Sequence, residues 1–267
     1  MKIYPFGSKS LKQRSKELTW IQTFASHPQR TKLASLQKVS ILRNFMREHN
    51  LSISSLRNVK HANQIHPTAI IDESAVLGEG NFIGPFCIIG KDVIIGNNNR
   101  LEAHCSIGTP PEHKDFWHGT FKSVEVGDNC IIREYATVNS GTIRNTIIGN
   151  NVSLLHASYV AHDCIVGDNV TLSGNAAMGG HCTIFEGANI GLNVSIHQYS
   201  FVGHYSMIGM GTVITKKSLI EPTKTYVGNP ARFLKENQHA IKKNNLNIKD
   251  IERFHREFHA ALSAPKK

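Results

Sequence analysis

A period of six residues dominates the second half of this chain and restricts what it can fold into. When the aliphatic residue that recurs at every sixth position is counted as the first place of a hexad, the fifth place holds a small or β-branched residue from Val152 to Ser218. Neither a helix, with its period of 3.6, nor a strand, with its period of two, produces such a pattern. We therefore predict a mainly β protein, a parallel β-helix built from hexapeptide repeats. Every sixth residue is aliphatic: Ile148, Leu154, Val160, Val166, Leu172, Met178, Ile184, Ile190, Ile196, Val202, Ile208, Ile214 and Ile220.

Three hexads complete one triangular coil, so residues 18 apart are expected to stack on one face, about 4.8 Å apart. The repeat begins at Ile65 and keeps its phase to Ile107. It is interrupted over residues 109–123, where a loop leaves the solenoid, and it slips again over residues 140–147. Glycines follow several aliphatic positions, and we expect them at corners, where glycine tolerates a positive φ. They are Gly78, Gly84, Gly90, Gly96 and Gly108.

The two ends of the chain do not repeat. Residues 10–27 and 31–50 carry apolar residues at helical spacing, so residues 1–64 are predicted to form a helical N-terminal extension. The β-helix is predicted over residues 65–230 and a helical tail over residues 231–267. The tail places its apolar residues three to four apart, which indicates one amphipathic helix. These residues are Ile248, Ile251, Phe254, Phe258 and Leu262.

The charge is concentrated in the N-terminal extension. Residues 1–64 hold 12 Lys and Arg against 2 Asp and Glu, a net +10, whereas residues 65–267 hold 18 of each kind and are neutral. A basic patch can attract an acidic partner such as a carrier protein, a nucleic acid or a membrane surface. A solvated helical face is the competing interpretation. The extension lacks the interleaved aromatic residues of single-strand binders, so we expect no DNA or RNA partner.

Composition also limits the compartment and the chemistry. No apolar run approaches the roughly 20 residues of a membrane span, and no secretory signal opens the chain, so a cytoplasmic location is expected. All five cysteines occupy the small inward position of a hexad and lack CxxC spacing, which favours buried packing over metal or disulfide chemistry. They are Cys87, Cys105, Cys130, Cys164 and Cys182.

Polar residues that stack on one another provide the strongest chemical signal. His162, Gly180 and Gln198 follow one another at intervals of three hexads, so they should lie on one face in consecutive coils. Asp163 adjoins His162, and the remaining histidines of this column are His181 and His197. A base beside a carboxylate, together with a glycine N–H that can stabilise an oxyanion, is the set that acyl transfer needs. Solvated corner histidines are the competing interpretation, which the regular spacing disfavours.

The ordered set His162-Asp163, Gly180-His181 and His197-Gln198 resembles the UDP-N-acetylglucosamine O-acyltransferase family. Further similar segments are Ile83-Gly84-Pro85-Phe86 and Ile132-Arg133-Glu134, so the resemblance covers roughly residues 65–230. It implies a left-handed β-helix, a homotrimer with sites between subunits, and the first step of lipid A biosynthesis. The acyl donor implied is an acyl-carrier-protein thioester, with no tightly bound cofactor and no metal.

The resemblance also implies roles for individual residues. His162 would be the general base, Asp163 would tune it, and the N–H of Gly180 would form the oxyanion hole. His181, His197 and Gln198 would position the sugar and the thioester. Three further assignments follow from the same comparison: Met210 as the residue that limits acyl-chain length, Lys114 and Asp115 of the ejected loop as sugar contacts, and Tyr159, Asn229 and Arg232 as substrate contacts.

Departures from the family pattern leave alternatives open. Tyr159 stands where the family usually has a second histidine, and the run from Pro111 to Trp117 replaces its sugar-contacting loop. The ending Gly228-Asn229-Pro230-Ala231-Arg232 is similar to that of acetyl-CoA-dependent sugar acyltransferases. One alternative is therefore CoA-dependent N- or O-acylation of another UDP- or dTDP-linked sugar. Another is a γ-class carbonic anhydrase zinc site, although His156 and His162 lie six apart rather than five.

Overall fold

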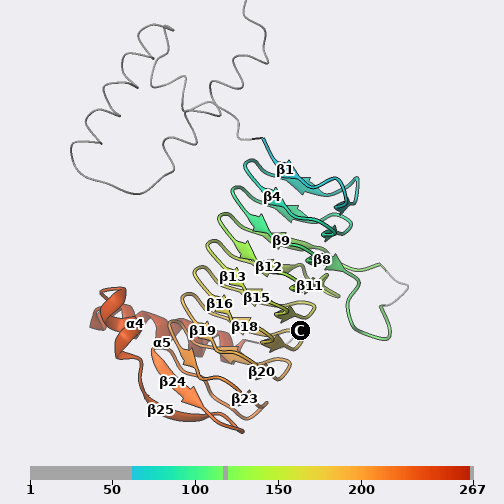
Figure 1. The fold of residues 1–267 in the computed structure, drawn as a ribbon. Coiled ribbons are helices and arrows are strands. Elements are labelled where there is room, and N and C mark those ends of the chain that lie inside the picture. The colour runs from blue at the N-terminus through green and yellow to red at the C-terminus, as the bar shows by residue number, and fades with distance from the viewer. Residues whose placement is uncertain (1–61, 117–119, 265–267) are drawn as a thin grey trace, which may run out of the picture. The chain divides into compact units, whose positions relative to one another are not determined.

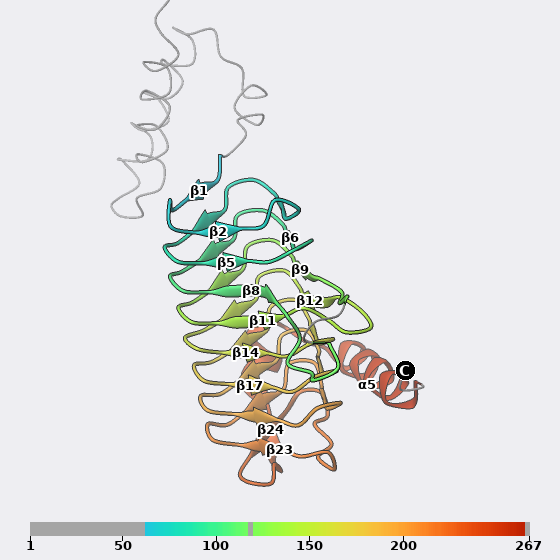
Figure 2. The same ribbon diagram turned by 90° about the vertical axis from the view of Figure 1, so that its right-hand side faces the viewer.

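The computed structural model describes residues 62–116 and 120–264. Within them the chain winds as a solenoid of short parallel strands, which Figures 1 and 2 show as a ladder of stacked coils. The strands form three sheets, called here A, B and C, with 10, 8 and 7 members. The predicted parallel β-helix is confirmed, whereas the helices expected over residues 10–27 and 31–50 lie outside the described residues.

Each strand of the solenoid pairs in parallel with the strand one coil further along, and among the described strands only the last member of sheet A departs from this rule, since it runs antiparallel to its neighbour. Sheet A contains β1 (Gln64–Ile65), β4 (Phe82–Ile83), β7 (Arg100–Leu101), β10 (Ile131–Ile132), β13 (Ser153–Leu154), β16 (Thr171–Leu172), β19 (Asn189–Ile190), β22 (Met207–Ile208), β24 (Lys224–Val227) and β25 (Arg232–Glu236). Sheet B contains β2 (Ile70–Ile71), β5 (Ile88–Ile89), β8 (Ser106–Thr109), β11 (Thr137–Asn139), β14 (Tyr159–Val160), β17 (Ala177–Met178), β20 (Ser195–Ile196) and β23 (Val213–Ile214). Sheet C contains β3 (Val76–Leu77), β6 (Ile94–Ile95), β9 (Val124–Val126), β12 (Thr146–Ile148), β15 (Ile165–Val166), β18 (Thr183–Ile184) and β21 (Phe201–Val202).

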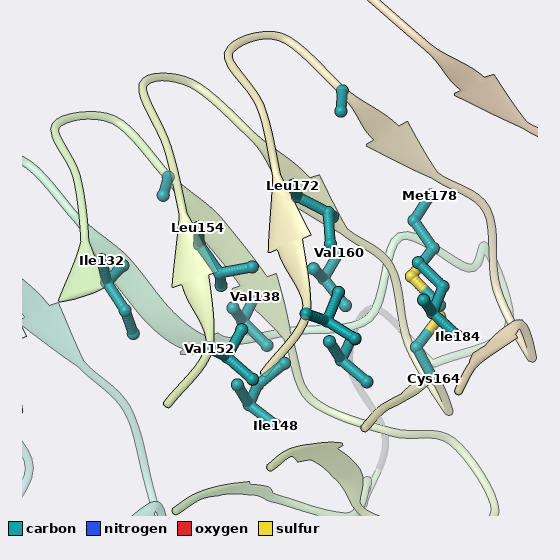
Figure 3. Close-up of a cluster of buried hydrophobic side chains, with 14 of the residues drawn as sticks. Ile132, Val138, Ile148, Val152, Leu154, Val160, Cys164, Leu172, Met178 and Ile184 are labelled. Atoms are coloured by element: carbon teal, nitrogen blue, oxygen red, sulfur yellow. The ribbon is translucent and has the colours of Figure 1, made fainter. Parts of the chain in front are cut away.

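The hexad pattern produces the core. The aliphatic residues from Ile148 to Ile220 are at most 5% exposed, and they point into the solenoid together with the small residues of the fifth position (Figure 3). All five cysteines are buried and unpaired, as predicted. The register is three hexads, since Val160 pairs with Met178 and Met178 pairs with Ile196. Apolar burial along this column is worth about 25 cal/mol for each Å² removed from water.

The expectation about glycines was wrong at four of the five positions. Among Gly78, Gly84, Gly90, Gly96 and Gly108, only Gly108 has a positive φ. The left-handed residue lies two places further on, where Asn, Asp, His and Tyr dominate. Glycine is needed for another reason: a Cβ on Gly84 would lie 2.9 Å from the carbonyl oxygen of Leu101 in the next coil. Close stacking of corners, not backbone freedom, therefore explains the four glycines that lack a positive φ.

The solenoid ends in an antiparallel hairpin that the sequence pattern did not indicate. Strand β25 turns back along β24, and helices α4 (Gln238–Lys243) and α5 (Ile248–Ser263) follow. Phe254 of α5 stacks on His204, and Phe258 packs against Phe185, so both phenylalanines are buried. The predicted tail helix is confirmed as α5. Ile248, however, is 75% exposed, because it starts the helix before the buried face begins.

Candidate functional site

The predicted column of polar residues exists at the corner between sheets B and C. His162 follows β14, Gly180 follows β17 and Gln198 follows β20. Backbone hydrogen bonds hold the coils together here: the N–H of His181 donates to the carbonyl of His162 at 3.0 Å, and the N–H of Tyr199 donates to that of Gly180 at 2.9 Å. The repeat of three hexads therefore stacks His162, Gly180 and Gln198 in consecutive coils, as the sequence predicted.

Asp163 orients the imidazole of His162. The Asp163 Oδ2 atom lies 2.7 Å from His162 Nδ1, and the His162 side chain is only 9% exposed. A carboxylate accepts hydrogen bonds, so Nδ1 carries the proton and Nε2 is left with a lone pair. Asp163 adopts φ = +60°, a conformation that Asp tolerates better than most residues. The pair is a base with a defined tautomer, held at the corner of the coil.

The second interruption of the repeat, residues 140–147, holds Asp163 in place. Backbone N–H groups of Thr142, Ile143 and Arg144 donate to its carboxylate at 2.9–3.0 Å, and the Thr142 hydroxyl donates at 2.6 Å. The Arg144 guanidinium binds the Asp163 carbonyl. Burial alone would raise the pKa of Asp163, but the hydrogen bonds from His162, Thr142 and the backbone amides hold it well below its usual range. Asp163 therefore stays ionised.

Gly180 lies directly against the base. A Cβ on Gly180 would be 2.7–2.8 Å from the Cε1 and Nε2 atoms of the His162 ring, so a larger residue would displace it. Within the described residues the N–H of Gly180 donates to no backbone acceptor. In the described part of the chain, the equivalent corner amide of His162 also donates to no backbone acceptor. Gly180 is therefore distinguished from other corner residues by the position of its available N–H, which lies next to the Nε2 lone pair of His162.

His181 forms the second wall of the site. Its ring lies edge-on to that of His162 at 5.1 Å and is stacked on Tyr199 at 4.5 Å. Its Nε2 atom is 3.7 Å from Asp163 Oδ2, too long for a hydrogen bond. Burial lowers the pKa of His181 in spite of the nearby Asp163 carboxylate. A neutral imidazole here can donate or accept a hydrogen bond near neutral pH.

The ejected loop reaches the same corner through His113 and Glu112, two members of the run noted in the sequence to which no individual role was assigned. The His113 ring lies edge-on to His162 at 5.8 Å, and Glu112 accepts a hydrogen bond of 2.8 Å from the Tyr159 hydroxyl. Burial and this carboxylate raise the pKa of Tyr159. The predicted sugar contacts, Lys114 and Asp115, are exposed on the same loop. Trp117 lies outside the described residues.

The remaining predicted site residues divide between two corners. His197 and Gln198 are exposed in the column above Gly180. Met210 follows β22, at the corner between sheets A and B, and is 72% exposed. Asn229 lies at the A–B corner as well, where the N–H of Val213 donates to Gly228, and Arg232 follows shortly after as the first residue of β25. Within one chain these three residues are not brought together with His162.

A groove of about 1030 Å³ adjoins His181 and runs over the outer face of sheet C. The outward side chains Ile165, Thr183 and Phe201 follow one another along its floor, one coil apart. Arg144 lines one side, and Ala261 and Ala264 at the end of α5 line another. A mostly apolar channel therefore begins beside the histidine pair.

A metal ion fits this site poorly. His162, Asp163 and His181 offer ligand atoms within 4.8 Å of one another. The Asp163 carboxylate, however, already accepts N–H and O–H groups from Thr142, Ile143 and Arg144, and these donors would have to be displaced. His156, the residue the carbonic anhydrase alternative needs, packs against Tyr135 and joins no metal-sized group among the described residues.

The comparisons with known proteins agree with this geometry. A model described as bacterial transferase hexapeptide (six repeats) matches residues 74–109 and 145–180. An acyl-[acyl-carrier-protein]–UDP-N-acetylglucosamine O-acyltransferase from Gloeothece citriformis is 33% identical over 57% of this chain and 55% of its own length. The enzyme of the same name from Xylella fastidiosa is 45% identical over 58% of this chain and 66% of its own. The chain thus spans only part of the curated relatives it matches, often about half.

A solved structure, LpxA from Acinetobacter baumannii, superposes with a TM-score of 0.62 and 30% identity, covering 76% of this chain and 86% of that one. The fold is accordingly the left-handed β-helix that the resemblance implied. None of the helices in the described residues is long and apolar enough to span a membrane. With this coverage and identity, the chain belongs to the UDP-N-acetylglucosamine O-acyltransferase family of hexapeptide-repeat proteins.

Proposed function

We propose that this protein transfers an acyl group from an acyl-carrier-protein thioester to a hydroxyl of a nucleotide sugar, UDP-N-acetylglucosamine being the favoured acceptor. The observation that carries the proposal is the contact of the His162 ring, held by Asp163, with Gly180. The names of the relatives support the donor and the acceptor. The proposal includes no tightly bound cofactor, and it places the reaction in the cytoplasm.

The residues suggest how the reaction would proceed. A sugar hydroxyl donates to Nε2 of His162, and its oxygen attacks the thioester carbonyl carbon while the proton passes to Nε2. The carbonyl electrons move onto its oxygen, which the Gly180 N–H stabilises. The C–S bond then breaks, and the imidazolium returns the proton to the leaving thiolate. Asp163, which stays ionised, stabilises the imidazolium between these two steps.

A panel that crosses donors with acceptors tests this proposal. Thioesters of acyl carrier protein and of CoA would each be tried with UDP-N-acetylglucosamine, other UDP-sugars and dTDP-sugars, with kcat/KM as the readout. We expect the highest value for the carrier-protein thioester with UDP-N-acetylglucosamine. A preference for CoA and another amino sugar would support the alternative suggested by the ending Gly228–Arg232, and no transfer to any sugar would overturn both.

The loop that contacts His162 is proposed to select the sugar. Lys114 and Asp115 are exposed beside His113, which packs on the His162 ring. A hydrogen bond to a charged group is worth about 1.5–3 kcal/mol, or roughly 10–100-fold in binding. We expect Lys114→Ala or Asp115→Ala to raise the sugar KM by about that factor and to leave the thioester KM near wild type. Lys122→Ala, at the other end of the loop, serves as the control, and an equal change in both KM values would contradict the assignment.

Met210 is proposed to limit the length of the acyl chain. It lies at the A–B corner and His162 at the B–C corner, so the proposal requires a homotrimer in which the site lies between copies of the chain. Each CH₂ kept out of an apolar groove loses about 0.8 kcal/mol of binding, roughly fourfold. We expect the wild type to prefer short or medium acyl chains.

A chain-length profile of kcat/KM tests this role. Met210→Gly should shift the optimum to longer chains, and Leu192→Ala, an exposed apolar control one coil earlier, should leave it in place. An unchanged profile in Met210→Gly would remove Met210 from this role. A monomer in sedimentation would contradict the shared site.

A further inference from the structure

A second cluster of metal-ligating side chains lies far along the chain from the residues of the candidate site. Glu221, His255 and His259 each offer one ligand atom, and these atoms lie within 4.8 Å of one another. Glu221 follows Ile220, which bridges to Val202 in the last coil. The two histidines belong to α5. The cluster therefore joins the C-terminal helix to the end of the solenoid.

The spacing on α5 places both histidines on one side of the helix. Residues four apart lie one turn above each other, so His255 and His259 form a row. The adjacent row, Phe254 and Phe258, is buried against His204 and Phe185. The solenoid therefore fixes the rotation of α5 and, with it, the direction of the histidine row. The two imidazole rings are 6.3 Å apart and inclined by only 23°.

The charges around Glu221 favour a cation. Lys224 donates to Glu221 Oε2 at 2.5 Å, which is the only hydrogen bond to this carboxylate in the part of the chain that the structure describes. Lys224 is also the cross-strand partner of Glu236. Two carboxylates and one ammonium leave a net charge of −1 beside two imidazoles. Glu221 Oε1 can then serve as a ligand while Oε2 keeps its contact with Lys224.

We propose that Glu221, His255 and His259 form a binding site for a zinc ion or a similar divalent transition metal. Two imidazoles and one carboxylate are ligands that zinc accepts, at about 2.0–2.2 Å. Ligand atoms on one tetrahedral ion lie roughly 3.3 Å apart, given those bond lengths, and the ligand atoms of the three residues already lie within 4.8 Å of one another. Three protein ligands leave one position for water.

The bound ion would act as a clamp between α5 and the last coil. The end of α5 contributes Ala261 and Ala264 to the groove beside His181. Fixing α5 through His259, two residues before Ala261, would hold that wall of the groove in place. Because a metal that binds the folded state stabilises it, the clamp should also raise the unfolding temperature.

The test uses the full chain, freed of metal with a chelator and without an affinity tag. Zinc uptake is counted by equilibrium dialysis with elemental analysis, cobalt(II) absorption reports the ligand set, and the unfolding temperature is followed with and without zinc. The zinc-dependent rise in unfolding temperature should be lost in His259→Ala and His255→Ala. Either substitution should weaken the affinity by about 100-fold or more, since outer partners of metal ligands alone account for 10–100-fold.

Two further variants make the result unambiguous. His239→Ala removes an exposed histidine of α4 outside the cluster and should bind as the wild type does. His162→Ala tests whether any zinc binds at the corner between sheets B and C instead. His259 is exposed, so His259→Ala should fold even if His255→Ala does not. The proposal is overturned if the wild type takes up no zinc, or if His259→Ala retains the same stoichiometry, cobalt spectrum and thermal shift.

Discussion

Replacing His162 by alanine is expected to lower kcat by about 10²–10⁴-fold, the range typical for loss of a general base. The His162 Nε2 atom has a free lone pair because Asp163 binds Nδ1, and it lies against Gly180, where the thioester carbonyl would be polarised. His181 and His113 are near, but each lies only at ion-pair distance from a carboxylate, His181 at 3.7 Å from Asp163 and His113 at 3.8 Å from Asp115, too far for the hydrogen bond that orients His162. Steady-state kinetics with saturating substrates measures the loss.

His156→Ala is the matched control. It removes a histidine from the neighbouring A–B corner, where the ring packs against Tyr135, and it should leave kcat near the wild-type value. Circular dichroism and sedimentation would check that both variants keep their fold and assembly. If His162→Ala kept more than a tenth of the wild-type kcat, another group would have to be the base.

Asp163→Ala is expected to be the most destabilising single change in the site. The Asp163 side chain is fully buried and accepts hydrogen bonds from Thr142, Ile143, Arg144 and His162. Removing a buried charged partner typically costs about 3–5 kcal/mol. For a chain of this size, that corresponds to a fall of roughly 6–20 °C in the unfolding temperature. Calorimetry at a fixed protein concentration measures it.

The pH dependence gives an independent check. The pKa of Asp163 is lower in the folded state than its ordinary value of 3.8, so its stabilisation is present at neutral pH and is lost as the pH falls below that ordinary value. The difference between wild type and Asp163→Ala should therefore shrink on acidification. Asp168→Ala removes a more exposed carboxylate that binds the Asn150 amide and should cost about 1 kcal/mol or less. A similar effect of both substitutions would contradict the buried role of Asp163.

The sequence predicted the core and the column of the site because both depend on a fixed period. Once three hexads make a coil, the alignment of His162 with Gly180 and Gln198 follows from arithmetic alone. The same rule placed the cysteines inside the solenoid. It could not predict which corner residue takes a positive φ, since the requirement falls on residues such as Asp163 and His181 as well as on glycine.

The parts that the sequence did not predict lie where the period fails. The Thr142–Arg144 turn that holds Asp163 lies in residues 140–147, where the hexad repeat is broken. Without the repeat, the sequence does not tell which residues of neighbouring coils come into contact. His113 reaches His162 from a loop whose path depends on contacts such as Glu112 with Tyr159. The pairing of α5 with His204 and Phe185 depends on tertiary packing between segments far apart in the chain. The domain limits at residues 64 and 230, and any role of residues 1–64 in steering an acidic carrier, stay predictions.

The most direct test of the central claim is identification of the reaction product. Purified protein would be incubated with a 3-hydroxyacyl thioester of acyl carrier protein and UDP-N-acetylglucosamine, and the sugar product would be analysed by mass spectrometry and NMR. We predict a nucleotide sugar that carries one acyl group in an ester at a ring hydroxyl, formed by wild type and nearly absent with His162→Ala. An amide product, equal product from His162→Ala, or hydrolysis of the thioester without transfer would contradict the account.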